Sequence, residues 1–215
     1  MTVRSIAKET SARRSVRRPV RLLAVSLTVA AVFATAADAQ TVIVPLDSAF
    51  TDDAHINRDA PNRSLGDNNN FRVGFNNDDL KRGVFRFETS LVPSPGTATS
   101  VQLVLKINDN YLDGYPMVLH AYSLAERFIE GTGINGYDVS WNDRMNDIPW
   151  SVPGGNWDPG KLSRATVQTW HDSLVLDITT QFQAWVADTS ENHGLILGDS
   201  LYFANPSWNY DNHGI

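Results

Sequence analysis

Aromatic side chains occur in the turn-rich stretch from residue 131 to residue 160, which contains Tyr137, Trp150 and Trp157. Tyr and Trp combine a flat apolar ring with a polar O–H or N–H group, so they can stack on a sugar ring and bind its hydroxyls. Loops also leave side chains free of core packing. These three residues are therefore candidate carbohydrate-binding residues. The alternative is that Trp150 and Trp157 are buried or fix the loops.

Basic residues on expected strands suggest a second kind of binding surface. If Phe85 and Phe87 point into the core, Arg82 and Arg86 point outward, and two further basic residues lie on outward phases of other strands. Arginine binds carboxylates through paired hydrogen bonds, which suits uronate groups. We expect a cationic stripe of Arg72, Arg82, Arg86 and Lys106. The alternative is a solvated face on which these residues pair with nearby acids.

Runs of Asp and Asn offer the oxygen ligands that Ca²⁺ prefers, but none of them has the spacing of an EF-hand. A structural calcium ion would need ligands from separate loops. The candidate ligands are Asp52, Asp53, Asp78 and Asp79. The alternative is that these runs form Asx turns. No cysteine is present, which excludes cysteine-ligated metals and disulfides.

Catalytic motifs are scarce in the sequence, and the one match, G-x-G-x-x-G at 131–136, lacks the helix that a dinucleotide site needs and is expected to be a loop. The sequence contains neither Gly-x-Ser-x-Gly nor His-Glu-x-x-His, and its five histidines do not show the spacing of metal ligands. Paired carboxylates could still serve a glycosidase or a lyase, but the sequence does not show which acids lie together. We therefore expect a protein that is not an enzyme.

Alternation with a period of two residues predicts the elements that hold these side chains. Apolar residues occupy every second position from Val101 to Ile107, as in a half-buried strand. Similar short strands are expected at 42–46, 71–75, 83–88, 116–123, 173–178, 194–198 and 201–204, separated by Gly, Pro and Asn turns. The pattern predicts an all-β fold, an antiparallel β-sandwich or jelly roll.

One window has helical spacing instead. Between 179 and 186 the apolar residues recur at helical intervals, and Thr180 with Gln183 matches a capping box. We expect one short helix here, packed on the sandwich with Trp185 in the core.

Charge is divided unevenly along the chain. Residues 1–39 hold seven of the 18 basic residues and two of the 24 acidic residues. Residues 40–215 therefore contain 11 basic and 22 acidic residues, which gives them a net charge of −11. A body of this charge repels a phosphate backbone, so we expect no nucleic-acid partner.

The basic segment also precedes a short apolar run, 22–36, and then Ala37-Asp38-Ala39. This order is typical of a secretory signal, and the run is shorter than the roughly 20 residues of a membrane span. We predict a signal peptide at 1–39, one secreted domain at 40–215, and no membrane span after cleavage.

Several short motifs follow one another along residues 42–204. They include Asp53-Ala-His-Ile56, Val139-Ser-Trp-Asn142, Trp150 to Pro153-Gly-Gly155, Gln183-Ala-Trp185 and Asn192-His-Gly-Leu-Ile-Leu197. Their order resembles the DNRLRE-type domain, akin to carbohydrate-binding module family 96. The resemblance implies a secreted β-jelly-roll module, found on cell-surface and polysaccharide-degrading proteins, that in some members binds alginate-like polyuronates. It does not imply catalysis.

The sequence departs from that family after Phe203-Ala204, where residues 205–215 replace the expected final strand, and the six-letter motif of the family name is absent. We expect the last strand to be missing and one sheet edge to be exposed. The sequence as a whole favours a secreted, non-catalytic module that binds acidic polysaccharide. The alternatives are a structural or adhesive cell-surface domain and, third, a polysaccharide-degrading enzyme.

Overall fold

A computed structural model describes residues 43, 51–67, 70, 72–76, 79–92, 98–109, 112, 116–132, 138–204 and 213–214. All of them belong to one compact unit, Thr41–Ile215. The predicted signal peptide lies outside the described residues, as does the strand expected at 42–46 apart from Ile43.

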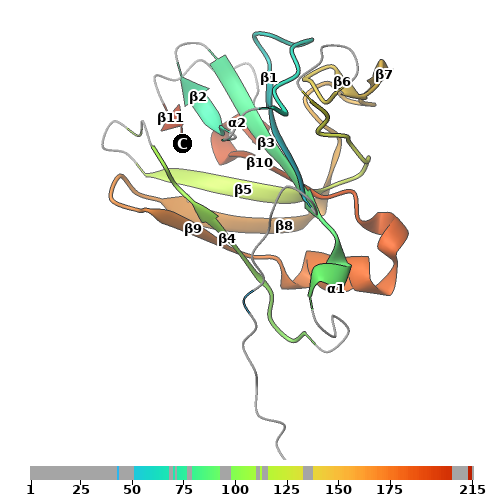
Figure 1. The fold of residues 1–215 in the computed structure, drawn as a ribbon. Helices are drawn as coiled ribbons and strands as arrows, with labels where there is room; N and C mark the ends of the chain where they lie inside the picture. Colours follow the sequence, from blue (N-terminus) through green and yellow to red (C-terminus); the bar gives the residue numbers. More distant parts are fainter. Residues whose placement is uncertain are drawn as a thin grey trace, which may run out of the picture. The chain divides into compact units, whose positions relative to one another are not determined.

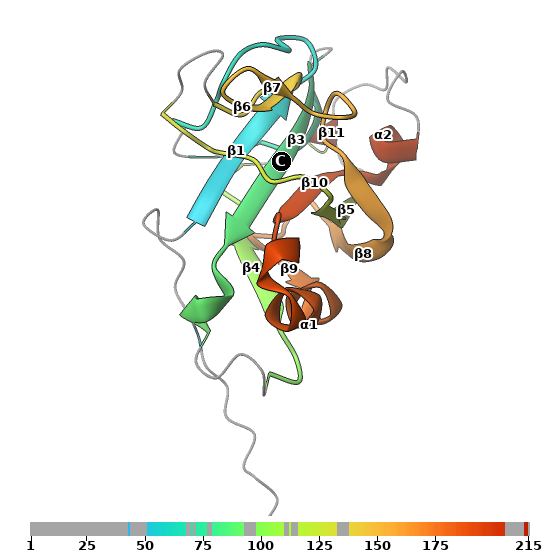
Figure 2. The ribbon, with the colours of Figure 1, turned by 90° about the vertical axis from the view of Figure 1, so that its right-hand side faces the viewer.

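The larger sheet is antiparallel throughout and runs in the order β11-β2-β3-β10-β5-β8, with β1 paired to β3. Figure 2 shows β1 beside β3. The strand β10 lies between β3 and β5, although it comes much later in the sequence. The strands are β1 (Thr51–Asn57), β2 (Gly74–Asn76), β3 (Asp79–Phe87), β5 (Met117–Leu124), β8 (Trp157–Val167), β10 (Leu195–Asp199) and β11 (His213–Gly214).

Two smaller sheets and two short helices complete the described fold. The strands β4 (Gln102–Lys106) and β9 (Ser173–Asp177) form a second layer against β5 and β8 (Figure 1). The strands β6 (Asp143–Met145) and β7 (Ile148–Pro149) form a separate hairpin. The helices are α1 (Thr179–Ala187) and α2 (Ser200–Ala204).

Apolar side chains cover both faces of the larger sheet. On one face Phe85 and Phe87 pack with residues of β4, β9 and α1, including Trp185. On the other face Val84 and Ile196 pack with side chains from residues 124–150 and α2. As a result, all five residues of β10 are buried, and β3 is buried from Arg82 to Phe87.

The structure confirms the all-β antiparallel sandwich. It also confirms the helix near 179–186 and the core position of Trp185. The predicted capping box is wrong, because no side chain caps the helix at Ile178; the Asp177 carboxylate instead accepts the Thr179 N–H.

Other expectations about elements need correction. Residues 201–204 are part of α2 and not a strand, so the described residues form two α-helices, besides the short 3-10 helices Thr89–Leu91 and Thr189–Glu191. Beyond Phe203-Ala204, His213–Gly214 pairs with β2 and so adds a short strand at that edge. No helix in the described part of the chain has the length and apolar character of a membrane span.

Candidate anion-binding site

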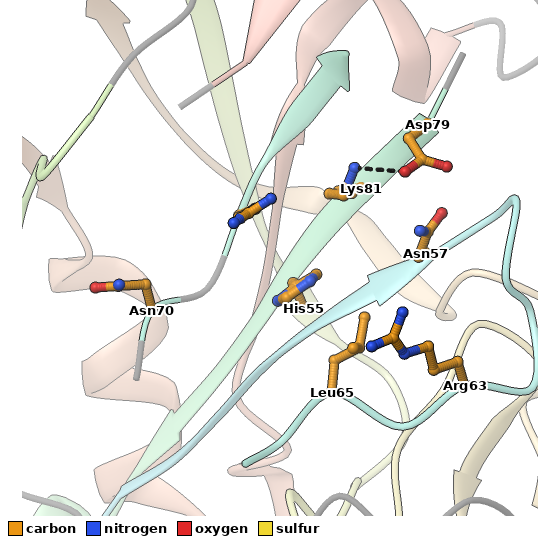
Figure 3. Close-up of a pocket in the computed structure, with 8 residues that line it drawn as sticks. His55, Asn57, Arg63, Leu65, Asn70, Asp79 and Lys81 are labelled. Carbon is orange, nitrogen blue, oxygen red and sulfur yellow. Dashed lines mark hydrogen bonds and ion pairs between the residues drawn. The ribbon is translucent and has the colours of Figure 1, made fainter. Parts of the chain in front are cut away.

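A pocket of about 440 Å³ lies beside the β1–β3 pair (Figure 3). Its lining comes from three nearby parts of the chain: β1, the loop that leads from β1 to β2, and the beginning of β3, which follows β2. The lining residues are His55, Asn57, Arg63, Leu65, Asn70, Arg72, Asp79 and Lys81. The pocket is therefore built from a short stretch of sequence.

The strand register brings part of the lining together. Asn57 pairs with Lys81 and His55 pairs with Gly83, and directly opposed residues of an antiparallel pair share a face. This face also carries Phe85, which the second layer covers. The pocket thus lies on the inward face of the sheet, toward the end of β1 that is away from Phe85.

The loop that supplies Arg63 and Leu65 is fixed against a distant segment. The Ser64 hydroxyl donates to the Asp138 carbonyl at 3.3 Å, and the Asn142 N–H donates to the Pro61 carbonyl at 3.0 Å. Gly66 allows the closest approach, since an added Cβ would clash with the backbone of Glu130. These contacts hold the pocket wall in a defined place.

Positive charge dominates the pocket. Three basic residues and one acid give a formal charge of +2 in a body of −11. Asp79 neutralises Lys81 through an ion pair of 3.0 Å. Arg63 and Arg72 form no ion pair with any residue that the structure describes. Two guanidinium groups therefore remain available for an anion.

His55 is a buried polar group in the lining. It is only 5% exposed, and its Nδ1 atom has no hydrogen-bond partner among the described residues. Burial, together with the three neighbouring cations, lowers the pKa of the imidazole to about 4. His55 is therefore neutral near pH 7. An anion bound in the pocket would offset the repulsion from the cations, which adds to the larger effect of burial.

Two members of the predicted cationic stripe, Arg72 and Lys106, lie on segments that a hydrogen bond connects. Arg72 lines the pocket, and Asn70 beside it accepts a hydrogen bond of 2.6 Å from Asn108, two residues after Lys106. Both basic side chains are exposed. The hydrogen bond joins the two segments, and of the two basic residues only Arg72 lines the pocket.

The expectation that Arg82 and Arg86 point outward is wrong. They are 3% and 9% exposed, because loops and α2 cover the outer face of β3. The Arg86 guanidinium binds the carboxylates of Asp52 and Glu88 and the Asn192 carbonyl. Neither arginine offers its charge to a ligand on the surface.

Arg82 lies instead between aromatic rings. Its guanidinium carbon is 4.8–5.0 Å from the ring centroids of Trp141, Trp157 and Phe203. It donates to the Gly154 carbonyl at 2.8 Å and to the Tyr202 carbonyl at 3.3 Å. Burial lowers its pKa to about 10, so it stays charged at neutral pH.

The tryptophans selected from the sequence do not form an exposed surface. Trp150 is 3% exposed and its indole N–H donates to the Ser140 carbonyl at 3.0 Å, so it fixes the loop. Trp157 is partly buried against Arg82, Tyr122 and Phe203. Tyr137 lies outside the described residues.

Two of the four predicted calcium ligands have basic partners. Asp52 pairs with Arg86 and Asp79 with Lys81, while Asp78 lies outside the described residues. The backbone N–H of Asp53 donates to the Glu130 carboxylate at 3.0 Å. Within the described ranges, no group of three or more His, Asp or Glu side chains is arranged to hold a metal ion.

Asp53 and Glu130 belong to a small acidic group. Burial raises the pKa of Glu130 to about 7, and the nearby acids Asp53, Asp52 and Asp138 add to this effect. Burial and Asp52 also raise the pKa of Asp53. Burial is the larger cause of both shifts, and mutual repulsion of the acids is the smaller one.

Sequence reasoning missed His55, Asn57, Arg63 and Lys81. His55 and Asn57 alternate with the apolar residues Ala54 and Ile56, and this alternation, which is typical of a strand, was the available signal. For Arg63 no local pattern exists, since its place depends on the loop folding back toward β1.

No family model matches the chain, and no curated protein matches it.

Proposed function

We propose that this protein is a non-catalytic module that binds acidic polysaccharide through the pocket around His55. The observation that carries the proposal is the presence of two guanidinium groups without acid partners beside a buried neutral imidazole. A uronate carboxylate would bind an arginine through two parallel hydrogen bonds. The amides of Asn57 and Asn70 are suited to sugar hydroxyls, and Leu65 offers an apolar contact.

The charge of the molecule supports a specific acidic ligand. A body of net charge −11 repels polyanions at a distance, so an acidic chain would be held only where the local sign is reversed. Resemblance of the motif order to DNRLRE-type domains points to the same class of ligand. Export through the predicted signal peptide would bring the module to such polysaccharides.

The lining favours binding over chemistry. Hydrolysis of a glycosidic bond uses two carboxylates, whereas the described lining holds only Asp79, which is paired with Lys81. A lyase needs a base that is poised near the working pH. His55, with a pKa of about 4, is a weak base at neutral pH.

The proposal is tested by measuring Kd for alginate, polygalacturonate and a neutral glucan by calorimetry. We expect binding of the two polyuronates only. Arg72→Gln and Arg63→Gln should each weaken it about tenfold or more, since hydrogen bonds to charged groups contribute roughly 1.5–3 kcal/mol.

Arg127→Gln is the matched control, because it removes one exposed positive charge outside the pocket. Equal losses in all three variants would mean that net charge and not the pocket controls binding. Release of unsaturated ends from polyuronate during the measurement would replace the binding proposal with a lyase.

A further inference from the structure

Trp170 is unusual among the described tryptophans because it is 75% exposed. The four others, Trp141, Trp150, Trp157 and Trp185, are buried or partly buried in the two cores. An indole ring so open to water is costly, since it leaves a large apolar area hydrated. A ligand that packed against the exposed indole of Trp170 would remove this apolar area from water.

The turn that carries Trp170 is held by its own hydrogen bonds. It connects β8 to β9, and the His171 N–H donates to the Gln168 carbonyl at 3.1 Å. The Gln168 N–H in turn donates to Nδ1 of His171 at 3.2 Å. The two rings meet edge to face at 6.0 Å. Little ordering of the turn is therefore needed when a ligand binds.

Hydrogen bonds connect this turn to the pocket. The Ile107 N–H donates to the Asp172 carbonyl at 2.9 Å, and the next residue, Asn108, donates to Asn70 of the pocket lining at 2.6 Å. Trp170 is two residues from Asp172, a backbone span of at most about 7 Å. Figure 1 shows the β8–β9 turn and the end of β4 on the side of the molecule where β2 lies.

An exposed positive charge lies on the strand beside the turn. Lys106 is exposed, pairs in register with Ser173 just after the turn, and forms no ion pair with a described residue. Hydrogen bonds, strand register and sequence adjacency thus link the pocket residues Arg72 and Asn70 to Asn108 and Lys106, and these to the turn of Trp170. In a sugar-binding site a cation binds a carboxylate, an amide binds a hydroxyl, and an aromatic ring stacks on a sugar ring.

We propose that Trp170 is a stacking residue for the polyuronate chain whose carboxylate occupies the pocket, so that the site recognises an oligosaccharide and not a single uronate. This inference rests on the proposed function and extends its site. The ligand lies along Asn70, Asn108 and Lys106, and one of its sugar rings stacks on the indole. Charge complementarity along this path favours an acidic glycan over an apolar protein surface.

The test compares a uronate disaccharide with a hexasaccharide by calorimetry. Wild-type protein should bind the hexasaccharide more tightly. Trp170→Ala should weaken hexasaccharide binding about tenfold and leave disaccharide binding unchanged, whereas Arg72→Gln should weaken both. Trp170→Phe should retain part of the affinity, because a phenyl ring can still stack. Ile148→Ala, at a 41% exposed site in the β6–β7 hairpin, is the matched control.

The outcomes separate the two proposals. If Arg72→Gln weakens both ligands and Trp170→Ala weakens neither, the pocket stands and the role of Trp170 is overturned. If the wild-type protein binds neither ligand, the proposed function itself fails. The exposed pair Val104 and Val175 on the same small sheet would suit a second copy of the chain. A dimer that is lost in Trp170→Ala, with hexasaccharide affinity unchanged, would assign the ring to that contact and also overturn the inference.

Discussion

His55 in the pocket makes the stability of the fold depend on pH. Its pKa is about 4 in the folded protein and about 6.5 in an unfolded chain. Between these values the unfolded chain binds more protons, so stability falls as the pH falls from about 6.5 toward 4. The loss from this one group is on the order of 3 kcal/mol, because one pKa unit corresponds to about 1.4 kcal/mol.

We therefore expect His55→Gln to flatten the pH dependence of stability over this range. The measurement is urea unfolding at about pH 7 and about pH 4.5. His193→Gln, at a partly exposed histidine outside the pocket, is the control and should follow the wild-type curve. An unchanged slope in His55→Gln would show that other groups set the acid sensitivity.

Arg82 is a second residue whose chemistry is specific. A planar guanidinium can contact three rings and bind two carbonyls, whereas the ammonium of lysine is a compact, strongly hydrated charge. Arg82→Lys should therefore destabilise the fold by about 2–3 kcal/mol, measured by thermal or urea unfolding. Lys106→Arg, at an exposed strand position without a described ion pair, is the control and should change stability by less than about 0.5 kcal/mol.

Glycines with positive φ show where elements approach most closely. Gly194, just before β10, has a φ of +95°, and an added Cβ would lie 2.5 Å from the Phe85 carbonyl oxygen. Gly194→Ala should cost at least about 2 kcal/mol, since the left-handed conformation alone costs roughly 1–2 kcal/mol in other residues.

Gly160→Ala is the matched control for this position. There the added Cβ would meet only the Asp158 side chain, at 3.2 Å, and φ is not in the left-handed region. We expect a change smaller than about 1 kcal/mol in urea unfolding. Similar losses in both variants would mean that the contact with Phe85 does not limit the packing of β10.

The elements that could be predicted from the sequence were those with a regular apolar period. Residues of β4, β5, β9 and α1 follow the periods of a half-buried strand or helix. By contrast, β8 contains Pro159-Gly160, which indicates a turn, and the structure accommodates it at a shift in the β5–β8 register. The short apolar run 201–204 suits a strand or a helix equally well.

The candidate site was harder to predict, for a physical reason. Alternation along β3 suggested one buried and one solvated face, but the sheet is covered on both faces, so Arg82 and Arg86 are buried. Polar residues at alternate strand positions are exposed to water only if no other segment packs over them. Here residues 138–156 and α2 pack over this face of β3. The quoted motifs Val139-Ser-Trp-Asn142 and Pro153-Gly-Gly155 therefore serve packing around Arg82.

At the scale of the whole molecule, the charge of the protein would control how the proposed acidic ligand approaches. The body carries −11, and the pocket is a small region of opposite sign. Raising salt from about 50 mM to about 500 mM shortens the screening length to well below about 8 Å. We expect weaker polyuronate binding in high salt, because the short-range attraction of the pocket is screened and cations compete for the carboxylates.

The measurement is the salt dependence of Kd, with Arg63→Gln as comparison. That variant should show a smaller salt slope than the wild-type protein, because it has one charge fewer in contact with the ligand. A salt-independent Kd would instead point to recognition by stacking and hydrogen bonds alone.

The place of β10 in the larger sheet has a consequence for the order in which the protein forms. Leu195 pairs with Phe85, 110 positions earlier, and β10 separates β3 from β5. A growing chain that has not yet reached β10 lacks the strand that joins the two halves of this sheet, and such distant pairings form slowly. The polypeptide therefore stays open until nearly all of its sheet strands have been synthesised. A sheet that closes this late leaves β3 and β5 with unpaired edges for most of synthesis, so the incomplete chain is the state most open to pairing with other chains.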